Sequence, residues 1–281
     1  MPSSSLRQVA GTFGYSAAET DARPRARRAS GVPRWWRIVG GALIPLAILG
    51  AWWLASTVGG VPAYKLPSPP AVVAAAIDLA QRGLLFVDIG ISTQRVLLGF
   101  AFGALIGLVL GALVGISTQA SVLLSPLLGA LRAVPSLAWL PLIMLYLGIF
   151  EVPKVTLITI GAAFPVFTTL AIALRHVDPH LVELGRAYGL RGVRLLTTVQ
   201  LPAVIPAIVS GLRLALAQSW LFLVAAELLN SSMGLGFLLI DSGNNGRVDR
   251  LFLAIVLLAI LGKTTDGLIG LVERWLLRRW G

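Results

Sequence analysis

The chain has 281 residues, of which 57% are hydrophobic and only 12% are charged, and its formal net charge is +11. Soluble domains carry about 25% charged residues. This composition therefore all but excludes a soluble enzyme, a nucleic-acid-binding module or a disordered chain, and it predicts an integral membrane protein. Because the chain has no cysteine, disulfides, thiolate metal sites and cysteine nucleophiles are excluded.

The N-terminal segment, residues 1–36, is rich in serine, alanine, arginine and proline and shows no apolar periodicity. Such a composition predicts a disordered tail. Arginines outnumber acidic residues in this segment, and an excess of basic residues marks the cytoplasmic segments of membrane proteins. We therefore expect a basic cytoplasmic tail.

The first apolar stretch predicts a membrane-spanning helix over residues 38–59, because a helix needs about 20 apolar residues to cross a bilayer. Residues 37–94 are expected to hold this helix and an external loop, since a proline-rich stretch at 67–70 is followed by moderately polar sequence. A short surface helix is expected near residues 70–82.

Residues 95–274 hold the remaining apolar stretches and are expected to form one transmembrane domain. The uncharged run between Arg95 and Arg132 is too long for one helix, so it predicts a span, a turn at 117–119 and the start of another span. The expected spans of this domain are residues 95–116, 122–149, 154–174, 201–227 and 249–271.

Six spans place the basic tail, the polar segment 175–200 and the basic C-terminus, residues 275–281, on one side of the membrane. The positive-inside rule makes that side the cytoplasm. The sequence therefore predicts an all-α membrane protein with six transmembrane helices and with both termini in the cytoplasm.

Glycines recur at every fourth position through the expected span 95–116. Small residues at this spacing let two helix backbones approach closely in lipid, where van der Waals contact drives helix association. The pattern favours a fixed helix-packing seam over a moving hinge surface. The seam residues are Gly99, Gly103, Gly107, Gly111 and Gly115.

Few charged residues fall inside the expected spans, and such residues usually face protein or water. Lys263 and Asp266 are three residues apart on one helix and are expected to pair. Arg132 and Arg213 allow two interpretations, namely arginines that snorkel or bond helices together, or a positive lining that attracts an anionic substrate.

Chemistry of other kinds is missing from the sequence. Residues 262–264 read Gly-Lys-Thr, but a phosphate-binding loop needs a glycine five positions earlier, and that position is Leu257. His176 and His180 flank a proline, which argues against a metal site. The carboxylates are scattered, so no acid, base and nucleophile gather as a membrane enzyme requires.

The polar segment carries a pattern with fixed spacings. It reads Glu183-Leu-Gly, three residues, Gly189, nine residues, and then Val-Gln-Leu201-Pro202. This resembles the EAA loop of bacterial ABC-transporter permeases of the importer type, in which Glu-Ala-Ala, three residues, Gly, nine residues and Ile-x-Leu-Pro follow one another. Leucine and glycine replace the two alanines, and valine replaces the isoleucine. The resemblance implies an ATPase-coupling loop with Glu183, Ala187, Gly189, Leu201 and Pro202.

Further stretches resemble the nitrate/sulfonate/taurine group of these permeases, and aliphatic sulfonate permeases in particular. The resemblance covers roughly residues 38–280. These stretches are Leu66-Pro-Ser-Pro69, the run from Arg132 to Leu142, Leu147-Gly-Ile149 with Glu151 and Lys154, Gly211-Leu-Arg213, Ala225-Ala-Glu227 and Gly234-Leu-Gly236.

The resemblance implies the transmembrane domain of a type I ABC importer over residues 95–274, in a bacterial plasma membrane. It implies a homodimer of permeases that works with two cytoplasmic ATPases and an external binding protein, without nucleic acid. ATP and Mg²⁺ would belong to the ATPases, so this lipid-embedded chain would itself hold no cofactor and no metal and catalyse no reaction. The expected pathway residues are Arg132, Trp139, Arg213 and Glu227.

The expected substrate is a small anion, an aliphatic sulfonate or a similar compound. Taurine, nitrate or a thiamine precursor are alternatives within the same group. A secondary transporter is the alternative of another class, and it should show an internal repeat with broken helices at matching positions. The sequence shows no such repeat.

Overall fold

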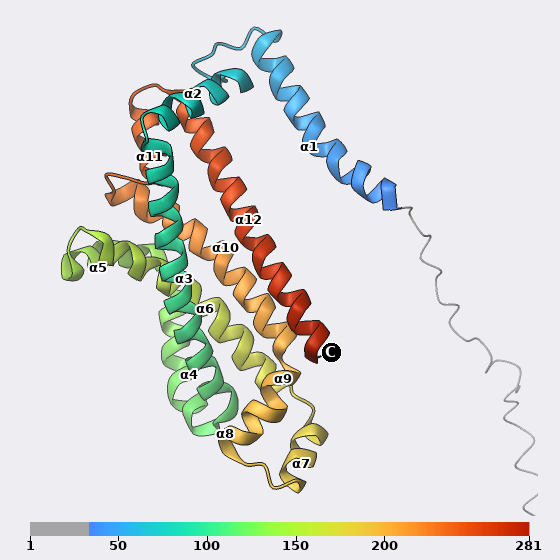
Figure 1. The fold of residues 1–281 in the computed structure, drawn as a ribbon. Coiled ribbons are helices and arrows are strands. Elements are labelled where there is room, and N and C mark those ends of the chain that lie inside the picture. Colours follow the sequence, from blue (N-terminus) through green and yellow to red (C-terminus); the bar gives the residue numbers. More distant parts are fainter. Residues whose placement is uncertain (1–33, 281) are drawn as a thin grey trace, which may run out of the picture. The chain divides into compact units, whose positions relative to one another are not determined.

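A computed structural model describes residues 34–280, and every regular element in that range is helical. Most of the expected tail, residues 1–33, lies outside the described residues. The chain divides into two units, Met1–Ala51 and Trp52–Gly281. Helix α1 (Arg34–Thr57) begins in the first unit and ends in the second. All elements discussed below belong to the second unit (Figure 1).

Three long helices form the centre of the second unit. These are α3 (Leu84–Ile116), α6 (Glu151–Arg175) and α10 (Ile205–Asn230). Helix α6 packs against both α3 and α10 along its length. The side chains between them are fully or almost fully buried and apolar, and they include Val96, Ile158, Ala162, Val166, Leu216 and Leu223.

The glycine seam of α3 lies against α6. A Cβ atom added at Gly103 would lie 2.6 Å from the Cβ of Ala162, and one added at Gly107 would lie 2.6 Å from the carbonyl oxygen of Ala163. Comparable close approaches occur at Gly99, Gly111 and Gly115. Any side chain at these positions would therefore push the two helices apart.

The span expected over residues 122–149 is not one straight helix. Helix α4 (Thr118–Ala133) ends before Pro135, and the 3₁₀ turn η1 (Ser136–Trp139) then continues into α5 (Leu140–Leu147). The segment Ser136–Leu147 is bent by 87° from α4. Val134 has extended backbone angles, as residues that precede proline prefer. Proline also lacks the N–H that would continue the helix.

Two short helices lie at the opposite end of the second unit from the polar segment, and a long helix runs from there back along α10 (Figure 1). Helix α2 (Pro69–Gln81) lies close to the expected surface helix, and it packs with α11 (Leu235–Asn244) and α12 (Val248–Trp280). Their shared core contains Val72, Ala75, Leu79, Leu235, Leu238, Leu253 and Ala254.

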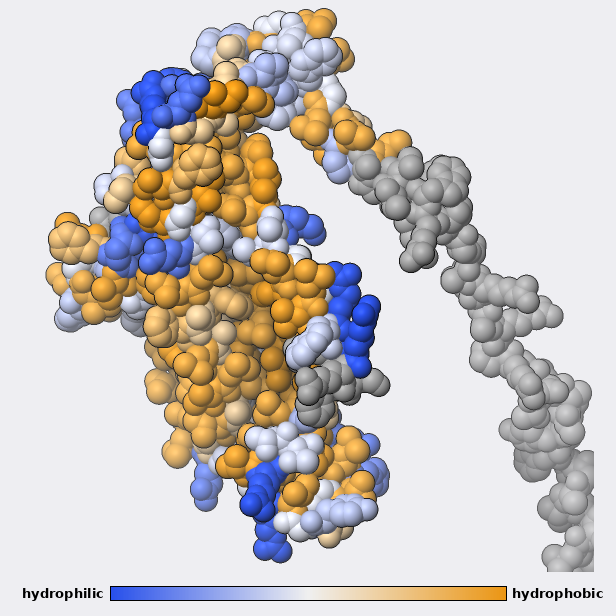
Figure 2. Space-filling view, in the orientation of Figure 1, coloured by the Kyte–Doolittle hydropathy of each residue, from blue (hydrophilic) through white to orange (hydrophobic). Residues whose placement is uncertain are grey.

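Among the described residues, four helices are long and apolar enough to cross a membrane, and the bent pair α4–α5 raises the number to five if it counts as one span. The four are α3, α6, α10 and α12, whereas the described apolar part of α1 is shorter. Figure 2 shows large apolar areas along these helices, interrupted by a band of more polar residues. Apolar areas of this kind suit contact with lipid. The count of six spans stays a prediction.

Candidate functional site

The polar segment folds into a chain of short helices between α6 and α10. These are α7 (Pro179–Ala187), α8 (Gly192–Leu195), the π-turn η2 (Leu196–Gln200) and α9 (Leu201–Ala203). Asp178 begins α7, because its side chain accepts a 2.9 Å hydrogen bond from the backbone N–H of His180. Pro179 then occupies the first helical position, where a missing N–H is harmless.

Gly189 ends α7 in a left-handed conformation with φ of +81°. The N–H of Leu190 donates to the carbonyl of Gly185 at 3.0 Å, and the N–H of Gly189 donates to the carbonyl of Arg186 at 2.9 Å. These two bonds form a Schellman motif, which favours glycine because a Cβ is strained at that φ. The glycine of the EAA-like pattern therefore stands where the backbone geometry favours glycine.

Gly185, which stands at an alanine of the family pattern, lies where α7 contacts the following helix. A Cβ there would lie 2.6 Å from Cδ1 of Leu195, so α7 rests directly on the buried Leu195 of the following helix. The opposite side of the segment is open to solvent. Its exposed apolar side chains are Leu181, Leu184, Tyr188 and Val193, with exposed fractions of 43%, 57%, 80% and 76%.

The expected coupling residues divide into two groups. Glu183, Ala187 and Gly189 are exposed on or directly after α7. Leu201 and Pro202 are half-buried in α9, just before α10 begins. The structure thus brings the first three onto one exposed turn and places the other two where the polar segment joins the membrane helix.

Arg213 bridges two helices. Its Nε and Nη2 donate to the two carboxylate oxygens of Asp266 on α12 at 2.9 and 3.1 Å, and its Nη1 donates to Glu273 at 3.1 Å. The expected partner of Asp266, Lys263, is more distant, at 3.9 Å between Nζ and Oδ2. Of the two interpretations of Arg213, this geometry supports the one in which the arginine bonds helices together.

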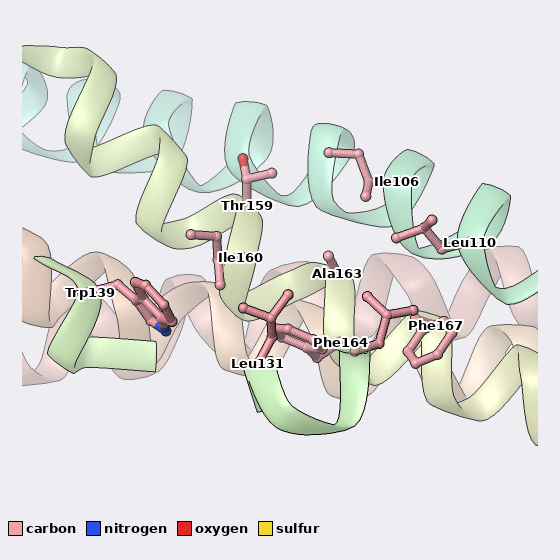
Figure 3. A pocket seen from close by; sticks show the side chains of 10 residues that line it. Ile106, Leu110, Leu131, Trp139, Thr159, Ile160, Ala163, Phe164 and Phe167 are labelled. Atoms are coloured by element: carbon pink, nitrogen blue, oxygen red, sulfur yellow. The ribbon is translucent and has the colours of Figure 1, made fainter. Parts of the chain in front are cut away.

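Trp139 lines an apolar cavity of about 290 Å³ between α3, α4, η1 and α6 (Figure 3). The residues that line this cavity include one hydroxyl group, that of Thr159, and it already donates a hydrogen bond to the carbonyl of Val155. Arg132 is exposed in the last turn of α4, and it makes no ion pair within residues 43–275. The other lining residues are Ile106, Leu110, Leu128, Leu131, Ile160, Ala163, Phe164 and Phe167.

Glu227, the fourth expected pathway residue, is fully buried among polar partners. Its carboxylate accepts hydrogen bonds from Nη1 of Arg95 at 2.6 Å, from Oγ of Ser92 at 2.9 Å and from the backbone N–H of Gly236 at 2.7 Å. A buried carboxylate is tolerated only when donors of this kind replace water.

The other edge of Arg95 holds a second carboxylate. Its Nε and Nη2 each donate to one oxygen of Glu151 at 2.6 Å, which is a bidentate pair. Nζ of Lys154 also donates to Glu151 at 3.1 Å. The side chains of Arg95 and Lys154 are only 4% and 6% exposed, whereas that of Glu151 is 58% exposed.

The N-terminus of α11 lies against these charged residues. We call the group the charge cluster, and its members are Asp88, Ser92, Arg95, Glu151, Lys154 and Glu227. The backbone N–H of Gly234 donates to Asp88 and that of Leu235 donates to Ser92, both at 2.8 Å. Gly234 has φ of +115°, and a Cβ there would lie 2.4 Å from an oxygen of Glu227. Side chains of α3 and α10 thus satisfy the free N–H groups of α11.

Sequence reasoning did not find the role of Arg95. It treated this residue as the edge of a span and noted Glu151 and Lys154 only as part of a family resemblance. A signal was present, because Asp88, Ser92 and Arg95 are spaced four and three residues apart and therefore share one face of a helix. Their partners lie between 56 and 146 residues away along the chain.

Comparison with known proteins places these features in a family. Residues 99–278 match the family described as the binding-protein-dependent transport system inner membrane component. The chain is 40% identical over 253 residues to a protein of Escherichia coli (strain K12) named as an aliphatic sulfonates transport permease, SsuC, covering 90% of this chain and 95% of the relative.

A protein of the same name from Bacillus subtilis (strain 168) is 37% identical over 271 residues, covering 96% of each chain. A protein of Synechococcus elongatus named as a bicarbonate transport system permease, CmpB, is 31% identical over 283 residues, covering 94% of this chain and 99% of the relative. All three relatives are thus named as permeases.

Among solved structures, a chain of the MetNI methionine ABC transporter in an inward-facing conformation superimposes with a TM-score of 0.62. It is 22% identical, and the match covers 69% of this chain and 96% of that chain. This match shows the fold of a type I ABC importer permease. The chain belongs to the family of binding-protein-dependent transport system inner membrane components, the permeases of ABC importers.

Proposed function

We propose that this permease moves an aliphatic sulfonate, or a similar small organic anion, from an external binding protein into the cytoplasm. It would work as a homodimer in the plasma membrane, with both termini in the cytoplasm. Two separate ATPase subunits would bind and hydrolyse ATP with Mg²⁺. The chain itself would supply the pathway and the segment through which the ATPases move it.

The observation that carries this proposal is the construction of the polar segment. Its exposed apolar side chains lie on α7, at the C-terminal end of α7 and on α8, and α7 ends in a Schellman motif and rests on Leu195. Exposed apolar patches rimmed by charge are typical of protein interfaces. A separate ATPase that holds this patch could therefore displace α7 as a unit.

The displacement has a direct route into the membrane helices. Val204 follows α9 and packs in one buried cluster with Leu170 and Leu174 at the end of α6. Leu196 of η2 and Ile208 of α10 pack against the same cluster. Because packed side chains transmit displacement with little compression, movement of α7 would reach both α6 and α10.

The substrate class is supported by the relatives and by the cavity beside Trp139. Its lining is apolar, which suits an alkyl group better than it suits a bare inorganic anion such as nitrate or the bicarbonate of the CmpB name. Taurine carries an ammonium group next to its sulfonate, and some thiamine precursors are cations, and this lining offers no partner for either positive group. The aliphatic sulfonate is therefore the preferred substrate.

The test is reconstitution of the permease with its ATPase and binding protein in proteoliposomes. We expect ATP-dependent uptake of labelled ethanesulfonate that is not inhibited by excess nitrate, bicarbonate or thiamine. Uptake driven by an ion gradient without ATP would support a secondary transporter instead. Uptake of one of the competitors in place of ethanesulfonate would refute the substrate but not the coupling mechanism.

A further inference from the structure

Glu151 differs from every other member of the charge cluster in its exposure. Glu227 is fully buried, and Arg95 and Lys154 are almost fully buried, but more than half of the Glu151 side chain is open. Glu151 is also the first residue of α6 and follows the exposed Phe150. Its side chain can therefore swing away from Arg95 without disturbing the packing between α3, α6 and α10.

The other carboxylates of the cluster remain satisfied without Glu151. Glu227 keeps Nη1 of Arg95, Ser92 and the N–H of Gly236, while Asp88 keeps the N–H of Gly234. The donors left without an acceptor would be Nε and Nη2 of Arg95 and the ammonium of Lys154. Arg95 would then keep only Glu227 as an ion-pair partner, and Lys154 would lose its hydrogen-bonded carboxylate. Unmatched charge on buried cations is costly, so an anion from outside would be drawn to them.

We propose that Arg95 and Lys154 form an anion-binding site, that Glu151 occupies this site when no substrate is bound, and that the substrate's sulfonate displaces Glu151. The inference rests on the proposed function for the identity of the anion. Two oxygens of a sulfonate match the Nε–Nη2 edge of arginine as the Glu151 carboxylate does. The third oxygen would lie toward Nζ of Lys154.

Exchange of one anion for another also fits the needs of transport. The exchange replaces one anion on the Nε–Nη2 edge of Arg95 with another, so this buried edge is not left without an acceptor. The sulfonate would gain the bonds that Glu151 gives up. Net binding would therefore be weak enough for the anion to move on when the helices rearrange.

The experiment measures binding of ³⁵S-labelled ethanesulfonate to the permease–ATPase complex in lipid nanodiscs. Glu151→Gln removes the competing charge and keeps the shape of the side chain. We expect this variant to bind ethanesulfonate at least about tenfold more tightly than the wild type, since a hydrogen bond to a charged group is worth that factor or more. Lys154→Met, which retains the bulk of lysine without its charge, should bind it more weakly than the wild type.

Asp78 offers a matched control outside the cluster. Its carboxylate accepts hydrogen bonds from Arg82 and Arg250, both at 2.9 Å, and the Arg82 bond holds the pKa of Asp78 below its usual value. Asp78→Asn therefore also removes an ionised carboxylate that is paired with two cations. It should leave the binding of ethanesulfonate unchanged.

Equal affinity in the wild type, Glu151→Gln and Lys154→Met would overturn the anion site, as would an equal gain in Asp78→Asn. Should Glu151→Gln fail to assemble, Glu151→Asp applies the same test. Its shorter side chain competes less well for Arg95, so this variant should also bind ethanesulfonate more tightly than the wild type. Uptake by the wild type is measured in parallel. Absence of wild-type uptake refutes the proposed substrate, whereas normal uptake with equal affinities refutes only the site.

Discussion

The contact between α3 and α6 leads to a sharp prediction about the glycine seam. In Gly103→Ala, the new Cβ would lie 2.6 Å from the Cβ of Ala162 and 2.6 Å from the carbonyl oxygen of Thr159. Carbon atoms normally meet at about 3.5–4.0 Å. One of the two neighbours belongs to the backbone, so the helices must separate along part of their length.

Overpacking of this kind costs about 1–3 kcal/mol. For a domain of this size, each kcal/mol lowers the midpoint of thermal unfolding by about 2–4 °C. Gly90 provides the control on the same helix, because no atom lies within 4 Å of a Cβ placed there. Gly90→Ala should therefore be neutral or slightly stabilising, since alanine favours a helix over glycine.

The assay is thermal unfolding of the purified variants in detergent. We expect Gly103→Ala to melt several degrees below the wild type and Gly90→Ala to melt at or above it. The double variant Gly103→Ala, Ala162→Gly should recover only part of the loss, because the carbonyl of Thr159 stays in place. Equal melting temperatures for the two single variants would refute the tight seam.

Three further predictions concern the polar segment, the topology and the helix bridge. Gly189→Asn should retain more substrate-stimulated ATPase activity and uptake than Gly189→Val, since asparagine tolerates the left-handed conformation; equal loss would exclude the Schellman turn as the cause. A cysteine at Ser68 should react with an impermeant reagent from outside, whereas one at Tyr188 should react only after permeabilisation, and the reverse pattern would invert the topology. Arg213→Met and Asp266→Asn should each lower the melting temperature, and the double variant should lower it by less than the sum of the two single decreases. Strictly additive decreases would mean that the ion pair contributes nothing to stability.

Features that depend on neighbouring residues in the chain could be predicted from the sequence. The glycine seam and the turn at Gly189 are both spacing patterns, and each has a definite role in the structure. The bend at Pro135 was harder to predict, because proline alone does not decide it. Pro126 and Pro165 lie inside continuous helices, whereas the chain breaks before Pro135.

Charge pairing could not be predicted, because it depends on how distant helices pack. Lys263 and Asp266 looked like natural partners at three residues' separation, but the closer partner of Asp266 is Arg213, 53 residues away. Arg95 joins carboxylates that lie 56 and 132 residues further along the chain. Sequence spacing indicated which residues share a helix face, and only the packing shows what that face meets.

The two candidate sites occupy opposite ends of the same helices. Helix α6 begins at Glu151, in the charge cluster, and ends at Arg175, next to the polar segment, after 25 residues or about 37 Å. Helix α10 runs between the same regions in the opposite direction, with Glu227 near its end. Because the glycine seam holds α3 tightly against α6, these two helices would move as one body when the polar segment is displaced. Where this body and α10 move by different amounts, Arg95 and Ser92 on α3 would shift relative to Glu227 on α10. A movement imposed by the ATPases would then reach the proposed anion site through the pairing of Arg95.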